Sequence, residues 1–140
     1  MVPLLIGGSL FFDKRGVLKF NNNFDASGVK RIYTIQNASE TIERAWQGHQ
    51  IEQRWFSAIK GTFTIKLIKI DNWETPSRNL EMIDYQITDD SLHVLYVPPG
   101  YVTSIKGEEP EALLLVMADY FLHEIKDEYK FPQDYFKTHK

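Results

Sequence analysis

The sequence predicts a single all-β domain built as a sandwich or barrel, and three observations lead to this fold class. Runs rich in β-branched and aromatic residues alternate with short turns along most of the 140 residues. The segment 62–67 alternates strictly between polar and apolar residues, which places Phe63, Ile65 and Leu67 on one face of a strand. No repeat, low-complexity tract or linker divides the chain, so we expect one domain over residues 1–140.

Strands are expected wherever such a run lies between two turn signals. Six are predicted in this way, at 29–36, 55–59, 62–70, 80–88, 93–97 and 112–118. The apolar segment 1–12 is predicted to be an N-terminal strand, because it is interrupted by Gly7 and Gly8 and is too short to span a bilayer. After Asp119 the sequence turns charged and aromatic, which leaves either a short helix or an extended tail.

Composition excludes several classes of protein. The chain has no cysteine, which rules out a disulfide scaffold and thiol or iron–sulfur chemistry. A net charge of -3 and a pI near 5.8 argue against a nucleic-acid partner, because nucleic-acid-binding domains are usually basic. We expect no membrane partner either, and a cytoplasmic location is the default that remains.

Five short motifs, taken in order, resemble those of the dTDP-4-dehydrorhamnose 3,5-epimerases. The segments 13–16, 44–47, 54–61, 96–101 and 118–121 are similar to the family patterns D-x-R-G, R-G-L-H, K-L-V-R-V-V-R-G, W-I-P-P-G-F and T-D-Y-Y. The related sugar-nucleotide 3,4-ketoisomerases match at two further places. Val29-Lys-Arg-Ile-Tyr33 resembles their I-K-R-V-Y, and their R-G-F-H-A-H element ends in a histidine that His49 matches, twelve residues before Gly61.

The resemblance implies a cupin fold, which is a double-stranded β-helix or jelly roll, and usually a homodimer. It also implies a small-molecule nucleotide-sugar ligand and a reaction that passes through an enolate. A 4-keto sugar has acidic protons beside its carbonyl, so the site needs a base near neutral pH and a cation beside the enolate oxygen. No cofactor is required.

By this resemblance His49 is the expected base, and Arg54 is expected to stabilise the enolate oxygen. Arginines bind phosphate oxygens through paired hydrogen bonds. The expected substrate-binding residues are Arg15, Arg31, Tyr33, Arg44 and Gln47, with the three arginines on the phosphates.

Three positions depart from the epimerase pattern. Gln47 replaces the usual catalytic histidine, Thr103 replaces a second histidine, and Leu115 falls approximately at the position of the active-site tyrosine. An amide is not a useful base, so two hypotheses stay open. One is an isomerase or epimerase that uses His49, and the other is a catalytically silent cupin that binds a nucleotide sugar or serves as a scaffold.

A metal site is not expected. Many cupins hold a metal with three histidines and a glutamate, and here the matching positions carry Gln47, Thr103 and Arg54, so only His49 remains. The other three histidines, at 93, 123 and 139, have no partner spacing, and we expect surface or structural roles for them.

Overall fold

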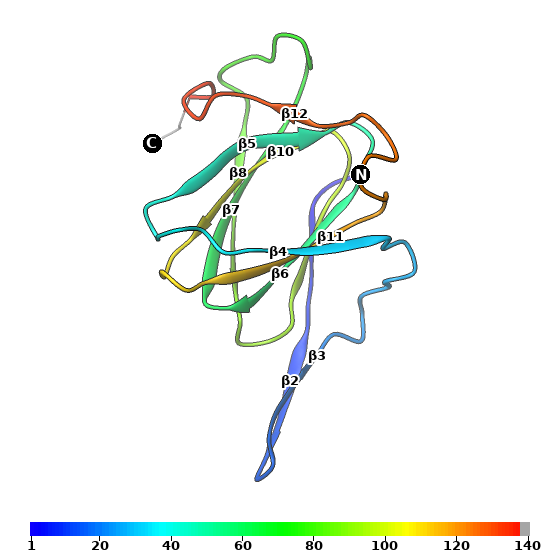
Figure 1. Ribbon diagram of the computed structural model, residues 1–140, viewed down its shortest axis with the longest axis vertical. Helices are drawn as coiled ribbons and strands as arrows, with labels where there is room; N and C mark the ends of the chain where they lie inside the picture. Colours follow the sequence, from blue (N-terminus) through cyan, green and yellow to red (C-terminus); the bar gives the residue numbers. More distant parts are fainter. Residues whose placement is uncertain (138–140) are drawn as a thin grey trace.

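The computed structural model describes residues 1–137, and its main feature is a pair of five-stranded antiparallel sheets that face each other (Figure 1). The first sheet has the order β1 (Leu4–Ile6), β9 (Val94–Val97), β6 (Arg54–Lys60), β11 (Leu113–Ala118) and β4 (Arg31–Ile35). The second has the order β12 (Tyr129–Lys130), β5 (Glu43–His49), β10 (Tyr101–Gly107), β7 (Thr62–Lys69) and β8 (Met82–Thr88). This arrangement confirms the predicted all-β jelly roll.

The core fills the space between the two sheets, as strand alternation requires. Phe63, Ile65 and Leu67 of β7 are fully buried, and they pack against inward side chains of the first sheet such as Leu114 and Val116 of β11. The apolar face predicted for the segment 62–67 is therefore one wall of this core.

All six predicted strands are present, with ends within two residues of the prediction. The predicted N-terminal strand is two strands, β1 and β2 (Ser9–Asp13), separated at Gly7 and Gly8. The sequence also predicts a turn at Lys106-Gly107, and this prediction is wrong, because both residues belong to a strand that was not predicted, β10. Within residues 1–137 there is no helix, and hence none long and apolar enough to cross a membrane.

A hairpin formed by β2 and β3 (Gly16–Phe20) projects away from the two sheets (Figure 1). Its turn lies at Asp13–Gly16, the segment that resembles the pattern D-x-R-G, and Gly16 has a φ of 136°, a conformation that favours glycine. The hairpin is a two-stranded sheet of its own, without a third strand among residues 1–137.

The chain that follows β11 forms what we call the C-terminal strap, residues 119–131. It is the extended alternative of the sequence prediction, and at its end β12 pairs with β5. The residues beyond it are anchored by aromatic packing, with Trp46 of β5 and Phe136 5.5 Å apart between ring centroids. The strap thereby lies against the strand that carries His49.

Candidate functional site

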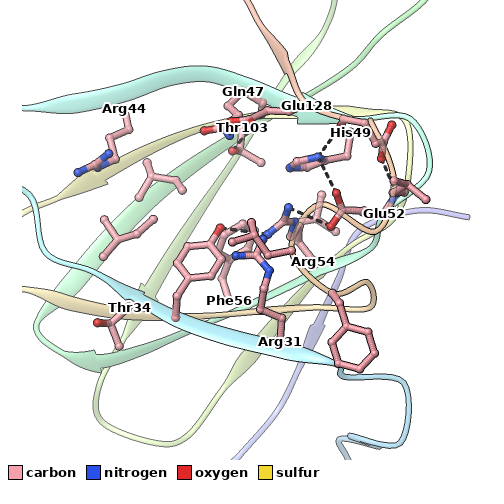
Figure 2. A pocket seen from close by; sticks show the side chains of 18 of the residues that line it. Arg31, Thr34, Arg44, Gln47, His49, Glu52, Arg54, Phe56, Thr103 and Glu128 are labelled. Atoms are coloured by element: carbon pink, nitrogen blue, oxygen red, sulfur yellow. Dashed lines mark hydrogen bonds and ion pairs between the residues drawn. The ribbon is translucent and has the colours of Figure 1, made fainter.

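A pocket of about 500 Å³ lies between the sheets, at the side where β4 of one sheet and β5 of the other face each other. Its walls come from β4, β5, β6, β10 and the C-terminal strap (Figure 2). The volume is typical of pockets that bind a small organic ligand. Of the seven site residues predicted from the sequence, six line this pocket: Arg31, Tyr33, Arg44, Gln47, His49 and Arg54.

His49 ends β5, and its imidazole is held by the C-terminal strap. Its Nδ1 lies 2.8 Å from the main-chain carbonyl oxygen of Asp127. Because a carbonyl oxygen only accepts hydrogen bonds, Nδ1 must carry the hydrogen, and this leaves Nε2 of the neutral ring with a free lone pair. The side chain is 13% exposed. His49 is therefore arranged to take a proton at Nε2.

Asp127 is itself fixed by three main-chain amides. Its carboxylate accepts hydrogen bonds from the N–H groups of Gln50, Ile51 and Glu52, at 2.8 to 2.9 Å. These residues form the loop between β5 and β6. The strap is thus bonded to the loop next to His49. These bonds also hold the Asp127 carbonyl that orients the imidazole.

The surroundings of His49 lower its pKa from the ordinary value of 6.5. Burial is the largest cause, because it disfavours the charged imidazolium, and the positive charge of Arg54 is the second. The hydrogen bond with Asp127 and the negative charges of Asp127 and Glu128 act in the opposite direction and raise the pKa. The net effect keeps His49 neutral, and thus able to act as a base, at neutral pH.

Arg54 is the buried cation of the pocket. Its guanidinium donates hydrogen bonds to the hydroxyl of Tyr33 at 3.0 Å and to Oε1 of Glu52 at 3.1 Å. The guanidinium of Arg31 lies over the Tyr33 ring, 4.8 Å from its centroid. Among the residues described, the buried Nε atoms of Arg31 and Arg54 have no hydrogen-bond partner. Arg31 and Arg54 therefore each have a hydrogen-bond donor that is not used within the described part of the protein.

Arg44 lies at the opposite end of the pocket from His49 and Arg54 (Figure 2). It is exposed, and its Nε donates a 2.8 Å hydrogen bond to Oδ1 of the buried Asn37. Gln47 is also exposed at the pocket rim, where its side-chain amide donates to Glu128 of the strap. A ligand that contacts both Arg44 and His49 must extend along the whole pocket.

Two sequence predictions are not matched by the pocket. Arg15 lies in the turn of the projecting hairpin, 82% exposed, and pairs with Asp13 at 2.7 Å. Leu115, expected near an active-site tyrosine position, does not line the pocket. It packs against Trp55 and Met117 on the outer face of the first sheet, because neighbouring β11 side chains alternate between the two faces.

The remaining histidines differ in their surroundings. His93 accepts a hydrogen bond from the Gly8 amide at 3.0 Å and lies far from the pocket, which fits the structural role expected for it. His123 lines the pocket mouth on the strap. His139 lies outside the described residues.

His49, Glu52 and Asp127 bring three potential metal-ligating atoms within 4.8 Å of one another. The donor set does not suit a cation. The Asp127 carboxylate already accepts three amide hydrogen bonds, and Glu52 is paired with the positive Arg54. The absence of a metal stays a prediction, which these contacts support.

Glu52 and the strap residue Asp127 were missed by the sequence analysis. Glu52 precedes Arg54 by two residues, so the two-residue period of a strand could have placed both side chains on the pocket side. Asp127 carries no such signal, because it lies in an irregular segment far from His49 in the sequence.

Comparison with known proteins supports the fold and the resemblance. No family model matches the sequence, and no curated protein matches it either. Among solved structures, a variant of the 3,4-ketoisomerase QdtA from Thermoanaerobacterium thermosaccharolyticum, in complex with TDP-4-keto-6-deoxyglucose, is 25% identical with a TM-score of 0.68. The match covers 90% of this chain and 85% of that one.

Two structures with lower sequence identity share the fold. A dTDP sugar isomerase from Desulfovibrio desulfuricans G20 is 18% identical with a TM-score of 0.73, over 94% of this chain and 85% of that one. A dTDP-4-dehydrorhamnose 3,5-epimerase from Sulfolobus tokodaii is 14% identical with a TM-score of 0.73, over 97% of this chain and 80% of that one. The resemblance predicted from the motifs is thus confirmed at the level of structure.

Proposed function

We propose that this protein is an isomerase or epimerase that acts on a nucleotide-linked 4-keto-6-deoxy sugar through an enolate. The observation that carries the proposal is a neutral His49, with a free Nε2, in the same pocket as the buried Arg54. Support also comes from the ketoisomerase similar to this chain, which was crystallised with TDP-4-keto-6-deoxyglucose.

The reaction follows from these two residues. Nε2 of His49 takes a proton from the carbon beside the ketone, and the electron pair of the broken C–H bond moves into an enolate whose oxygen becomes negative. The guanidinium of Arg54, which is buried, stabilises that charge. For ketone migration, the imidazolium returns the proton to the former carbonyl carbon while the proton of the neighbouring hydroxyl moves to the enolate oxygen. For epimerisation, water on the opposite face of the same carbon donates the new proton, and the imidazolium releases its own proton to solvent.

The pocket supplies cations for the nucleotide diphosphate. Arg31 keeps an unused Nε donor next to the Tyr33 ring, and Arg44 is exposed at the other end. A buried donor without an acceptor costs about 1–3 kcal/mol, so an anionic ligand that reaches it is favoured. We assign phosphate contacts to Arg31 and Arg44, while Tyr33 and Gln47 form pocket walls.

Exchange of sugar protons with solvent tests the proposal. The protein is incubated in deuterated water with TDP-4-keto-6-deoxyglucose or a related keto sugar, and deuterium at the carbons beside the ketone is followed by NMR. Incorporation supports an enolising enzyme. Thermal protection by the nucleotide without incorporation, across several keto-sugar nucleotides, replaces the proposal with the silent nucleotide-sugar binder that Gln47 suggests.

The pH dependence of this exchange is a separate prediction. The neutral form of His49 is the active base, so the rate is full above its pKa and is lost as the pH falls through it. Because burial and Arg54 lower that pKa, we expect the acid limb of kcat/KM below the ordinary value of 6.5. A pH–rate profile measures the limb directly, and a midpoint at or above 6.5 contradicts the assignment of His49.

We further propose a homodimer, formed at least in part through the β2–β3 hairpin. An isolated two-stranded hairpin is at best marginally stable in water. This one exposes several large apolar side chains, which a second copy could cover: Leu10, Phe11, Phe12, Val17 and Leu18. Arg15 reaches a ligand only in such an assembly. This contact and the cytoplasmic location stay predictions.

A charge placed on the hairpin tests the dimer. Leu18→Glu puts a carboxylate among apolar side chains that become buried on association, so we expect it to shift the protein to a monomer. Light scattering after size-exclusion chromatography gives the mass. Ile42→Glu, which alters an exposed loop residue away from the hairpin, is the matched control. A wild-type mass of one chain overturns the homodimer, and a Leu18→Glu dimer of unchanged affinity overturns the role of the hairpin.

A further inference from the structure

Glu52 lies between the imidazole of His49 and the guanidinium of Arg54. It lies in the loop just before β6, and its side chain is 11% exposed. One carboxylate oxygen, Oε2, is 3.5 Å from Nδ1 of His49, and the other, Oε1, is 3.1 Å from the Arg54 guanidinium. Figure 2 shows the carboxylate between these two side chains. Glu52 is thus the side-chain carboxylate shared by the base and the cation.

The position of Glu52 is also fixed by its backbone. Its amide donates to Oδ2 of Asp127, the residue whose carbonyl accepts from His49 Nδ1. The Asp127 carboxylate is already occupied by three amides, so it is a weaker counter-charge for the imidazole than a carboxylate free of such bonds. In Glu52, by contrast, the carboxylate oxygen Oε2 remains available to interact with Nδ1 of His49.

Proton uptake by His49 creates a positive charge close to Arg54. The positive charge of Arg54 already lowers the pKa of His49, because it repels the imidazolium. This repulsion opposes the transfer of a proton from the sugar to His49. An ionised Glu52 lies between them and offsets this repulsion. It also attracts the Nδ1–H group, which holds the ring in the tautomer that leaves Nε2 free.

The charges around Glu52 determine whether it is ionised. Burial raises its pKa, and the negative charges of Asp127 and Asp119 raise it further, while Arg54 and Arg31 lower it. The ion pair at 3.1 Å favours the carboxylate form. The net effect is a raised pKa for Glu52, and the ion pair with Arg54 keeps its carboxylate ionised while His49 gains and loses its proton.

We propose that Glu52 is a positioning residue for His49: it orients the imidazole and, in addition to the charges of Asp127 and Glu128, supplies negative charge that lets His49 accept a proton beside Arg54. Its chemical role rests on the proposed function, whereas the pairing with His49 can be tested without any substrate. The proton goes to Nε2 of His49 and returns from it, and Glu52 keeps its charge throughout.

The experiment follows the titration of the His49 ring by NMR in the full-length protein, with histidine labelled with ¹⁵N. Glu52→Gln removes the charge and retains the shape, so the pKa of His49 should fall below its wild-type value. Glu111→Gln removes an equal charge from an exposed residue paired with Lys60, and should leave the pKa unchanged. The same His49 pKa in all three proteins overturns the proposal.

A measurement on the wild type covers the case in which Glu52→Gln does not fold. The ring nitrogen shifts of His49 should show a second inflection, caused by titration of the neighbouring carboxylate, and a single simple titration curve overturns the pairing. The neutral ring should carry its hydrogen on Nδ1, which the nitrogen shifts distinguish. A ring that carries it on Nε2 also overturns the pairing.

The rate of proton exchange in Glu52 variants tests the positioning role directly. In the exchange assay, Glu52→Gln should lower the rate by more than about tenfold, since a carboxylate that orients a histidine base has effects of at least this size. Thermal protection by TDP should persist, and Glu52→Asp should recover part of the rate. If wild type shows no exchange, the proposed function fails, yet the titrations still decide whether Glu52 and His49 are paired.

Discussion

We expect His49→Ala to lose nearly all exchange of sugar protons with deuterated water. The neighbouring groups are poorly suited to replace it, because Gln47 is an amide, the carboxylate of Asp127 is held by backbone amides and that of Glu52 is paired with Arg54. Removal of a general base typically lowers the rate by about 10²–10⁴-fold. NMR of the sugar protons measures the loss, and TDP should still raise the melting temperature because Arg31 and Arg44 are unchanged.

The matched control is His93→Ala. His93 is a structural histidine that bonds the Gly8 amide far from the pocket, so its loss should leave the exchange rate as in the wild type. Exchange that survives in His49→Ala contradicts the choice of base and directs attention to another pocket residue. Loss of exchange together with loss of TDP protection instead indicates that the variant no longer forms the site.

The fold could be predicted because most strands carry the pattern of a half-buried surface. β7 is the clearest case, with Phe63, Ile65 and Leu67 fully buried and polar residues between them. β10 was missed for the opposite reason. It is paired on both sides, with β5 and β7, and buried along nearly its whole length, so no alternation marks it.

The site was predicted less completely than the fold. Motif positions indicated His49 and Arg54, and both line one pocket, because the consecutive strands β5 and β6 of the two facing sheets carry them. The residues that control their charge were not found. Asp127 acts through its main-chain carbonyl, which any residue possesses, and it reaches His49 only after the strap folds back over β5.

The same limit applies to the interpretation of Gln47. At the sequence level, an amide in place of a histidine indicates a lost activity. The structure shows this amide at the pocket rim, bonded to Glu128, while His49 two residues later is the imidazole held by the strap and paired with Glu52. In the proposed reaction, proton transfer is therefore assigned to one histidine whose surroundings, and not its motif, determine its basicity.

Arg54→Met should cause the largest combined loss of stability and activity. Arg54 is buried and pairs with Glu52, so its removal leaves an uncompensated carboxylate and an unpaired Tyr33 hydroxyl. Loss of one partner of a buried ion pair typically costs about 3–5 kcal/mol of unfolding free energy. Loss of the group that stabilises the enolate should lower the exchange rate by about 10²–10³-fold. Urea denaturation and the exchange assay measure the two effects separately.

A second substitution distinguishes charge imbalance from loss of packing. In the double variant Glu52→Gln with Arg54→Met, no buried charge is left unpaired, so part of the lost stability should return although the exchange activity does not. Arg15→Met changes an exposed arginine and should alter stability by no more than about 0.5 kcal/mol. If the double variant is as unstable as the sum of its single variants, Glu52 and Arg54 are not coupled, and the charge balance inferred around His49 does not hold.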